Sequence, residues 1–274
     1  MGETVLSPAP RRSGREVVER LAARGAALVA LSGGVDSALV AALARAAVGA
    51  DAVAVTLRGP AVAAGEVERA RRVARAVGIE HRVVSVDPLA LPEYRANTPN
   101  RCYFCRSVET TALRREGASL GIRQYLDGVQ VDDLSDDRPG IRAMDEAGFD
   151  HPLVWAGWTK PEVRREAKAR GVPNWAQPSD ACLSSRIAHG VPVSAELLDR
   201  IERGEAWIAA QGFRRVRLRT RGLDARVEVD PDEVARLRSE PLASQLRSAL
   251  TEVGFSTIEV DPHGYRGGRT VTAP

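Results

Sequence analysis

The sequence has few cysteines and no long run of apolar residues. Three cysteines among 274 residues do not provide a disulfide framework. Because no stretch resembles a membrane span or a secretory signal, we expect a cytoplasmic protein without a membrane partner. The net charge of +3 allows nucleic-acid binding but does not demand it, and no internal repeat is present. The composition is that of a globular protein with one large or two modest domains.

Two common phosphate-binding motifs are also missing, since there is neither a P-loop lysine motif nor a G-x-G-x-x-G. A different turn is present. An apolar run over residues 27–31 leads into Ser32-Gly33-Gly34-Val35-Asp36-Ser37, and an apolar helical pattern follows. This order predicts a buried strand, a tight turn and a helix N-terminus.

The residue types in this turn suit a bound phosphate. Gly33 and Gly34 allow a ligand to approach the backbone, and the first N–H groups of the helix favour an anion. Ser32 and Ser37 add hydroxyl donors. Asp36 is explained by a bound divalent cation or by a role as N-cap. The turn therefore predicts a nucleotide phosphate site, against the alternative of a glycine-rich turn without a ligand.

Strands and helices alternate through the first two thirds of the chain, after a segment over residues 1–14 that we expect to be disordered. The pattern predicts strands over 26–31, 51–57, 82–86, 124–129 and 152–155, separated by helices. We therefore expect an α/β domain over residues 15–189 with a doubly wound, parallel, five-stranded sheet. Ligands of such sheets bind beyond the carboxyl ends of the strands. The residues at this edge are Thr56, Leu57, Gly128, Asp132 and Asp133.

The pattern changes at about residue 190. It predicts a long helix over 194–211 with Ser194 as its N-cap, two strands over 215–219 and 225–229, helical structure over 231–253 and a last strand over 256–260. This order predicts a small α+β domain over residues 190–274 with an antiparallel sheet. Before it lies a long irregular stretch over 172–187, which is typical of a functional loop or a linker.

The cysteines form two groups. Cys102 and Cys105 make a C-x-x-C at the start of a predicted helix, and Cys182 lies in the irregular stretch. Structural zinc would require four Cys or His ligands, and no histidine is obviously near, although His189 lies seven residues after Cys182. Three thiolates suit an iron–sulfur cluster with one iron left for an exogenous sulfide. A redox-active cysteine pair and three buried thiols remain alternatives.

Arginines on one predicted strand suit phosphate recognition. Arg217 and Arg219 lie on the same strand face, with geometry for bidentate binding of a phosphate. A solvated basic face is the alternative. Glu205 and Glu228 either bind a metal or pair with these arginines.

Several motifs, taken in order, resemble the LarE family of the PP-loop ATP pyrophosphatase superfamily, over residues 15 to 270. They are Ser32-Gly-Gly-Val-Asp-Ser37, Arg101-Cys-Tyr-Phe-Cys105, Gly128-Val-Gln-Val-Asp-Asp133 with Arg138-Pro-Gly140, Ala181-Cys-Leu-Ser-Ser-Arg-Ile187, and Gly264-Tyr-Arg-Gly-Gly268. The chain departs from the family at Arg269, where a serine is usual, so we assign no hydroxyl role there.

The resemblance implies an ATP-dependent sulfurtransferase of nickel-pincer nucleotide biosynthesis. Such an enzyme adenylates the carboxylates of pyridinium-3,5-biscarboxylic acid mononucleotide and then delivers sulfur. Some members sacrifice the sulfur of the cysteine that matches Cys182, and others carry sulfide on a 4Fe-4S cluster held by three cysteines. Because Cys102 and Cys105 are both present, we expect the cluster type, with Cys182 as donor in the alternative.

The resemblance also implies which residues form the site. We expect ATP at Ser32, Gly33, Gly34, Asp36 and Ser37, Mg²⁺ near Asp36, and adenine against Leu57 and Gly128. Arg186, Arg217 and Arg219 are candidates for the substrate phosphate or pyrophosphate, and Glu205 and Glu228 match carboxylates clustered near that site. We expect catalytic roles for Cys182, Asp36 and Arg186, and a homo-oligomer.

Three other functions compete with this one. A tRNA thiolase can also join a PP-loop to a three-cysteine cluster, but the chain has no cysteines left for a zinc knuckle and only a weak positive charge. An amide-forming synthetase such as NAD synthetase would leave the cysteines unexplained. A nucleotide-sensing adaptor would leave the cysteines and the irregular stretch unexplained.

Overall fold

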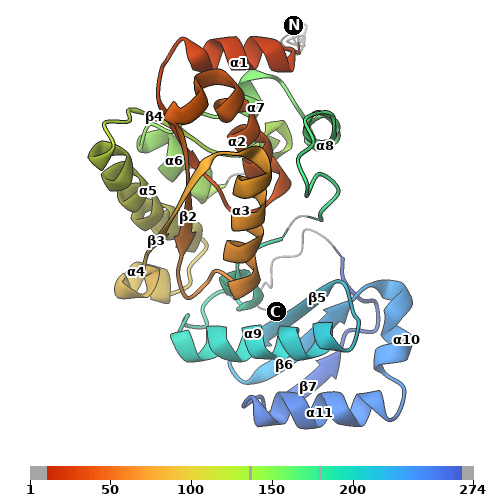
Figure 1. Cartoon of the computed structure of the whole chain (residues 1–274). Helices are drawn as coiled ribbons and strands as arrows, with labels where there is room; N and C mark the ends of the chain where they lie inside the picture. The colour runs from red at the N-terminus through yellow and green to blue at the C-terminus, as the bar shows by residue number, and fades with distance from the viewer. Residues whose placement is uncertain (1–10, 136–137, 179, 267–274) are drawn as a thin grey trace, which may run out of the picture. The chain divides into compact units, whose positions relative to one another are not determined.

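The computed structural model describes residues 11–135, 138–178 and 180–266. Its larger sheet consists of β1 (Ala27–Ala30), β2 (Ala52–Arg58), β3 (Glu80–Ser85) and β4 (Gln124–Leu126) in the order β3-β2-β1-β4 (Figure 1). All three strand pairs are parallel. The predicted α/β class with a parallel sheet is therefore confirmed, with four strands instead of five.

The predicted fifth strand is wrong. Residues Pro152–Trp155 form the short helix α7, which has proline at its first position, where the missing N–H is tolerated. Sheet pairing in this region is limited to an isolated bridge between Leu126 and Asp150. Four apolar or aromatic residues in a row do not distinguish a buried strand from one buried helical turn.

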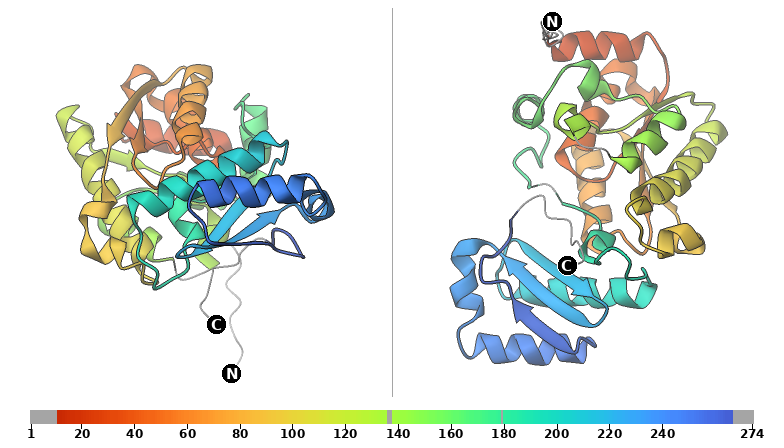
Figure 2. Two further views of the ribbon diagram at one scale, coloured as in Figure 1. Left: turned by 90° about the horizontal axis from the view of Figure 1, so that it is seen from below. Right: turned by 180° about the vertical axis from the view of Figure 1, so that it is seen from behind.

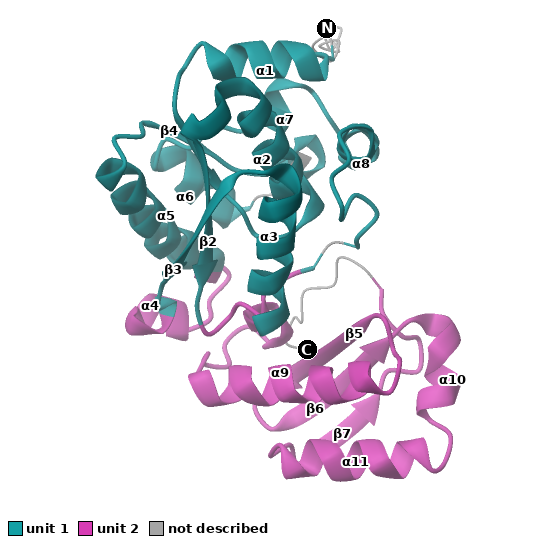
Figure 3. Ribbon diagram, in the orientation of Figure 1, with its two compact units in different colours: residues 1–59, 64–88, 102–180 teal, residues 60–63, 89–101, 181–274 magenta. Residues whose placement is uncertain are grey.

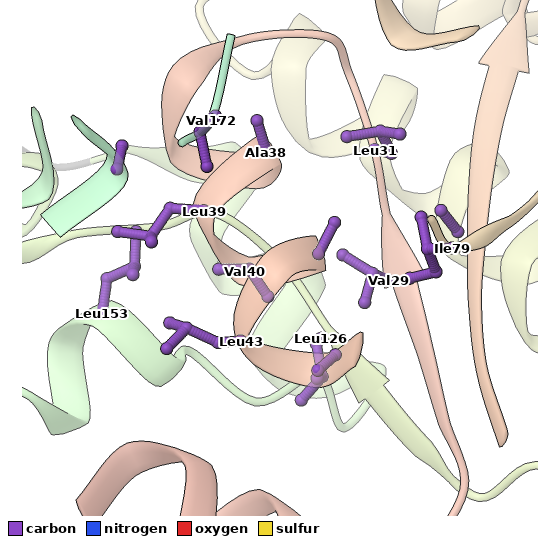
Figure 4. Packing of buried hydrophobic residues seen from close by; sticks show 14 of the residues in the cluster. Val29, Leu31, Ala38, Leu39, Val40, Leu43, Ile79, Leu126, Leu153 and Val172 are labelled. Atoms are coloured by element: carbon purple, nitrogen blue, oxygen red, sulfur yellow. The ribbon is translucent and has the colours of Figure 1, made fainter. Parts of the chain in front are cut away.

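Helices cover both faces of this sheet (Figures 1 and 2). One core cluster joins β1 to α2 and includes Leu39, Leu43 and Leu153 (Figure 4). A second cluster on the other face joins Leu28 to Leu113 and Met144. The helices that supply these side chains are α1 (Gly14–Ala22), α2 (Val35–Val48), α3 (Ala64–Val77), α5 (Arg101–Ser119), α6 (Pro139–Glu146), α7 and α8 (Lys160–Ala169).

Local sequence explains where these helices begin. Ser13 and Glu16 form a capping box at α1, so ordered structure begins before residue 14. Residues 1–10 of the segment that we expect to be disordered lie outside the described residues. Thr159 and Glu162 form a second capping box at α8. Short 3₁₀ turns connect several elements: Gly49–Asp51, Pro88–Ala90, Val131–Ser135, Leu183–Arg186 and Pro231–Glu233.

The smaller sheet contains β5 (Val216–Arg221), β6 (Asp224–Val229) and β7 (Thr257–Val260) in that order. The predicted α+β class holds, but the sheet is mixed, because β6 pairs antiparallel with β5 and parallel with β7. The helical segment after β6 is interrupted, giving α10 (Val234–Leu237) and α11 (Leu242–Glu252), and it returns the chain so that β7 runs alongside β6 in the same direction.

Helix α9 (Ala195–Ala210) begins at Ser194, whose side chain accepts a hydrogen bond from the Leu197 N–H as predicted. The helices α9 and α11 lie on the same face of the smaller sheet (Figure 2). Gly204 of α9 allows this packing, because a Cβ there would be 2.6 Å from Leu218 of β5 and 2.9 Å from Leu250 of α11.

The described chain divides into two compact units (Figure 3). The first comprises Met1–Gly59, Ala64–Pro88 and Cys102–Asp180, and contains the larger sheet. The second comprises Pro60–Ala63, Leu89–Arg101 and Ala181–Pro274, and contains the smaller sheet together with α4 (Pro92–Arg95). None of the described helices is both long and apolar enough to span a membrane.

Candidate functional site

The turn between β1 and α2 is held by its own two serines. The Ser32 and Ser37 hydroxyls are 3.0 Å apart, and the Ser32 backbone N–H donates to Ser37 Oγ at 3.1 Å. The Gly34 N–H is directed toward Ser32 Oγ at 3.3 Å. These contacts close the turn around the N-terminus of α2, where backbone N–H groups favour a phosphate.

Gly33 has a positive φ of 83° and lies directly against α3. A Cβ at this position would be 3.0 Å from the Ala70 nitrogen and from the Glu66 oxygen. The side-chain amide of Asn174 donates to the Gly33 carbonyl oxygen at 2.8 Å. The turn is therefore fixed from α3 on one side and from the segment after α8 on the other.

Gly128, which follows β4, touches the start of α2. A Cβ at this position would be 2.6 Å from the Ser37 nitrogen, a backbone atom that cannot swing away. Leu57 is partly buried near the end of the neighbouring strand β2, and the preceding Thr56 donates to the Leu31 carbonyl at 2.6 Å. The structure thus brings the sequence-predicted Gly128 to the glycine-rich turn.

Asp36 is paired with a lysine that the sequence did not point to. Lys160 Nζ is 2.5 Å from Asp36 Oδ2, and the side chains are 25% and 22% exposed for Asp36 and Lys160. Burial raises the pKa of Asp36 and the nearby charge of Asp133 adds to that effect, while Lys160 lowers it. Asp132 joins the group by accepting from the Lys160 backbone N–H at 2.9 Å.

This arrangement fits a divalent cation next to a nucleotide. Asp36 Oδ1 is buried and has no hydrogen-bond partner among the described residues. A carboxylate oxygen without a donor is the kind of ligand that Mg²⁺ takes, and Lys160 is a donor suited to a phosphate oxygen. Lys160 and Asn174 had no motif to reveal them, because one starts a charged helix and the other lies in an irregular stretch.

The cysteines are all accessible. Cys102 and Cys105 lie near the start of α5, exposed and partly exposed respectively. Cys182 is exposed and precedes the 3₁₀ turn Leu183–Arg186. Their spacing of three residues puts Cys102 and Cys105 on the same side of the helix. Cys105 Sγ is 3.3 Å from Glu109 Oε1. Exposed thiols do not match the alternative of three buried cysteines.

Within the described residues, no group of three or more His, Cys, Asp or Glu side chains is arranged to hold a metal ion. Cys102 and Cys105 belong to the first unit and Cys182 to the second. The three-cysteine cluster therefore stays a prediction, although exposed thiols are the donor type that an iron–sulfur cluster requires.

Arg186 is buried and engaged on several sides. Its Nε and Nη2 donate to the two oxygens of Glu205 at 2.9 and 3.0 Å. Its Nη1 donates to the carbonyl oxygens of Ala181 and Cys182. Glu205 also accepts from the Leu218 N–H at 2.9 Å. Through these contacts the Arg186–Glu205 pair connects the backbone of Cys182 to α9 and β5. The expected phosphate role of Arg186 stays a prediction.

Arg217 and Arg219 share one face of β5, as predicted, and both are largely buried. Arg219 Nε is 3.1 Å from Glu228 Oε2, and its Nη1 donates to the Ser185 carbonyl at 3.1 Å. Arg217 stacks over the Tyr265 ring with its guanidinium carbon 5.4 Å from the ring centre. Glu205 and Glu228 thus both pair with arginines, and a metal role for either stays a prediction. Arg269 lies outside the described residues.

A parallel sheet with a Ser-Gly-Gly-x-Asp-Ser turn at the start of its first helix defines a PP-loop nucleotide-binding enzyme. Comparison with known proteins agrees. The family model described as asparagine synthase matches residues 14–104. An uncharacterized protein of Synechocystis sp. is 38% identical over 243 residues, which is 89% of this chain and 91% of that protein.

Two further relatives are enzymes. The pyridinium-3,5-bisthiocarboxylic acid mononucleotide synthase of Lactiplantibacillus plantarum is 29% identical, over 88% of this chain and 87% of that protein. A tRNA-specific 2-thiouridylase of Desulforamulus reducens is 29% identical, over 55% of this chain and 52% of that protein. The chain belongs to the LarE family and is an ATP-dependent sulfurtransferase.

Proposed function

We propose that this enzyme adenylates the carboxylates of pyridinium-3,5-biscarboxylic acid mononucleotide and replaces oxygen by sulfur in the synthesis of a nickel-pincer nucleotide. The observation that carries the proposal is the glycine-rich turn with Asp36 and Lys160 beside it, in a chain similar along most of its length to a synthase of the bisthiocarboxylic acid mononucleotide.

The first unit supplies the nucleotide site. Ser32, Gly33, Gly34 and Ser37 would bind the phosphates, and adenine would lie against Leu57 and Gly128. Asp36 would hold Mg²⁺, which neutralises phosphate charge when bound. Lys160 would move from Asp36 to a phosphate oxygen as ATP binds. A substrate carboxylate oxygen then attacks the α-phosphorus, and pyrophosphate leaves.

Adenylation makes the next step feasible because AMP is a far better leaving group than an oxide. A sulfur nucleophile attacks the acyl carbon, and AMP leaves. Cys102, Cys105 and Cys182 would hold a 4Fe-4S cluster, which supplies a bound sulfide when present. In the alternative, the Cys182 thiolate displaces AMP to form a thioester, and β-elimination then breaks the Cβ–Sγ bond with loss of the Cα proton, which releases the thiocarboxylate and leaves dehydroalanine at residue 182. Either route needs Cys182 in a defined place, and the backbone contacts of Arg186 provide it.

The second unit supplies candidates for the phosphate of the mononucleotide. Arg217 and Arg219 lie on one face of β5. Glu228 is opposite Arg217 on the neighbouring strand β6, and Arg217 also contacts Tyr265. Guanidinium groups held by neighbouring side chains lose little freedom when they bind a phosphate. We propose that the homo-oligomer expected from the sequence is the form in which this enzyme acts.

The test combines metal analysis with product analysis. Wild type, Cys102→Ala and Ser107→Ala are purified without oxygen, assayed for iron and sulfide, and given ATP with the biscarboxylic mononucleotide. We expect AMP and thiocarboxylate from wild type and from Ser107→Ala, a control on the same helix, and iron loss in Cys102→Ala. Iron at background in all three would remove the cluster, and loss of one sulfur from Cys182 by mass spectrometry would establish the alternative.

The same assay separates this function from tRNA thiolation. The match to the tRNA-specific 2-thiouridylase makes tRNA the competing substrate, although that match covers only 55% of this chain. Thiolated tRNA, salt-dependent tRNA binding and no release of AMP when ATP is supplied with the mononucleotide would overturn the proposal.

A further inference from the structure

His151 lies between two carboxylates, one at each ring nitrogen. Its Nδ1 is 2.7 Å from Asp127 Oδ1, and its Nε2 is 2.7 Å from Asp145 Oδ1. A neutral imidazole has one N–H and one lone pair, so only the charged imidazolium donates to both carboxylates. With both carboxylates ionised, the geometry therefore favours a protonated His151.

The surroundings of His151 favour that proton. The Asp127 side chain is only 7% exposed, whereas Asp145 on α6 is 59% exposed. Burial lowers the pKa of His151, but the hydrogen bonds and charges of Asp127 and Asp145 outweigh it and raise this pKa to about 9.

Three other charged groups lie around this cluster. Arg106 of α5, whose side chain is 51% exposed, acts electrostatically on Asp127. Asp150, the neighbour of His151 in sequence, is paired at 2.7 Å with Arg24, which follows the end of α1. Among the described residues, His151 is thus a partly buried cation in direct contact with Asp127.

Asp127 in turn shapes the backbone that meets the nucleotide turn. Its Oδ1 accepts from the Val129 N–H at 3.0 Å, which closes a tight turn around Gly128. Its Oδ2 is buried and has no hydrogen-bond partner among the described residues. Gly128 lies so close to Ser37 that a Cβ would be 2.6 Å from the Ser37 nitrogen. A shift of Asp127 therefore moves the backbone that borders the phosphate site.

We infer that His151 is a positioning residue for nucleotide binding. Its hydrogen bonds to Asp127 and Asp145 hold the Gly128 turn against the first turn of α2. The inference rests on the proposed function, because it takes this site to bind ATP. Without the imidazolium, a buried carboxylate loses its counter-charge and turns toward water, and the Gly128 turn moves with it.

The test measures the dissociation constant of a non-hydrolysable ATP analogue with Mg²⁺ from about pH 6.5 to about pH 10. Wild type is expected to bind less tightly as pH rises through about 9, the pKa of His151. His151→Gln, which cannot donate to both carboxylates, is expected to bind about tenfold less tightly at neutral pH and to lose this alkaline change.

Two other variants complete the test. Asp145→Asn removes the negative charge of the exposed partner and is expected to shift the loss of affinity for the ATP analogue to lower pH. His263→Gln, an exposed histidine of the second unit, is expected to follow wild type. If His151→Gln and Asp145→Asn both match wild type at every pH, the inference is wrong while ATP binding stands. If wild type binds no ATP analogue at any pH, the proposed function and the inference both fail.

Discussion

The side-chain amide of Asn174 donates to the carbonyl oxygen of Gly33, at 2.8 Å across 141 residues of sequence. This contact fastens the glycine-rich turn to the segment that follows α8. Within the first unit the same segment is also held by Arg164, which donates to the Gln177 carbonyl at 3.2 Å, and by Arg69, which lies 3.5 Å from Asp180. Asn174 is thus held against the phosphate turn, and Gln177 and Asp180 are held to α8 and α3 within the same unit.

Replacing Asn174 tests what this anchor does for the turn. Asn174→Ala removes the donor to Gly33, and we expect the KM for ATP to rise about fivefold, the effect of losing one hydrogen bond of about 1 kcal/mol. Asn174→Asp should be worse, because a carboxylate repels both the carbonyl and a phosphate. Steady-state kinetics of AMP release check this. Asn100→Ala, at an exposed asparagine, is the control, and an unchanged KM in Asn174→Asp would contradict the expectation.

Gly128→Ala should close the nucleotide site by steric overlap. The added Cβ meets the Ser37 nitrogen at 2.6 Å and the Asp36 carbonyl carbon at 3.0 Å, both backbone atoms. We expect the free energy of unfolding to fall by about 2 kcal/mol and ATP binding to weaken by about tenfold or more. Gly65→Ala in the first turn of α3 meets only the flexible end of Arg69 at 3.4 Å, so it should stay within about 0.5 kcal/mol of wild type. Calorimetry measures both quantities.

The sequence is most informative where local pattern and chemistry coincide. The run that ends at Leu31, the Ser-Gly-Gly turn and the apolar helix after Asp36 predict β1, the phosphate site and α2, because each depends on neighbouring residues. The same reasoning fails at Pro152–Trp155, where four residues fit either a strand or a helical turn and tertiary packing decides. It also fails for the direction of β7, which depends on how α10 and α11 return the chain.

Residues that complete the site from far along the chain leave no local signal. Lys160 lies 124 residues after Asp36, and His151 lies 24 residues after Asp127. Arg186 was predicted as a phosphate ligand because of the motif around it. Its hydrogen bonds to Glu205 and to the Ala181 and Cys182 carbonyls show what the motif alone did not, namely that the guanidinium holds the cysteine's own backbone.

The Asp36–Lys160 pair should weaken the fold while serving ATP. Burial raises the pKa of Asp36 above its unfolded value, so ionising this carboxyl destabilises the folded state as pH rises through the folded pKa. We expect the free energy of unfolding of the double variant, Asp36→Asn with Lys160→Met, to be within about 1 kcal/mol of the wild-type value or above it. The double variant should nevertheless form no AMP. The free energy of unfolding of the double variant relative to wild type should rise as the pH increases from below the ordinary pKa of an aspartate through the raised pKa of Asp36. Denaturant titration measures it, and a large stability loss at neutral pH would contradict the account.

Arg186→Lys should separate sulfur delivery from adenylation. The Arg186 and Glu205 side chains are 3% and 15% exposed, and lysine can neither span both Glu205 oxygens nor reach the two backbone carbonyls at once. We expect a loss of about 3 kcal/mol in the free energy of unfolding, as for a broken buried ion pair. Thiocarboxylate formation should fall further than pyrophosphate release, because Cys182 loses its place while the nucleotide turn of the first unit keeps its contacts. Arg203→Lys is the control, since the Arg203–Asp199 pair is exposed on α9 at 61% and 62%. Measuring pyrophosphate and thiocarboxylate in parallel shows which of the two steps depends on Arg186. An equal fall in both products, at a temperature where Arg186→Lys is fully folded, would assign Arg186 to adenylation instead.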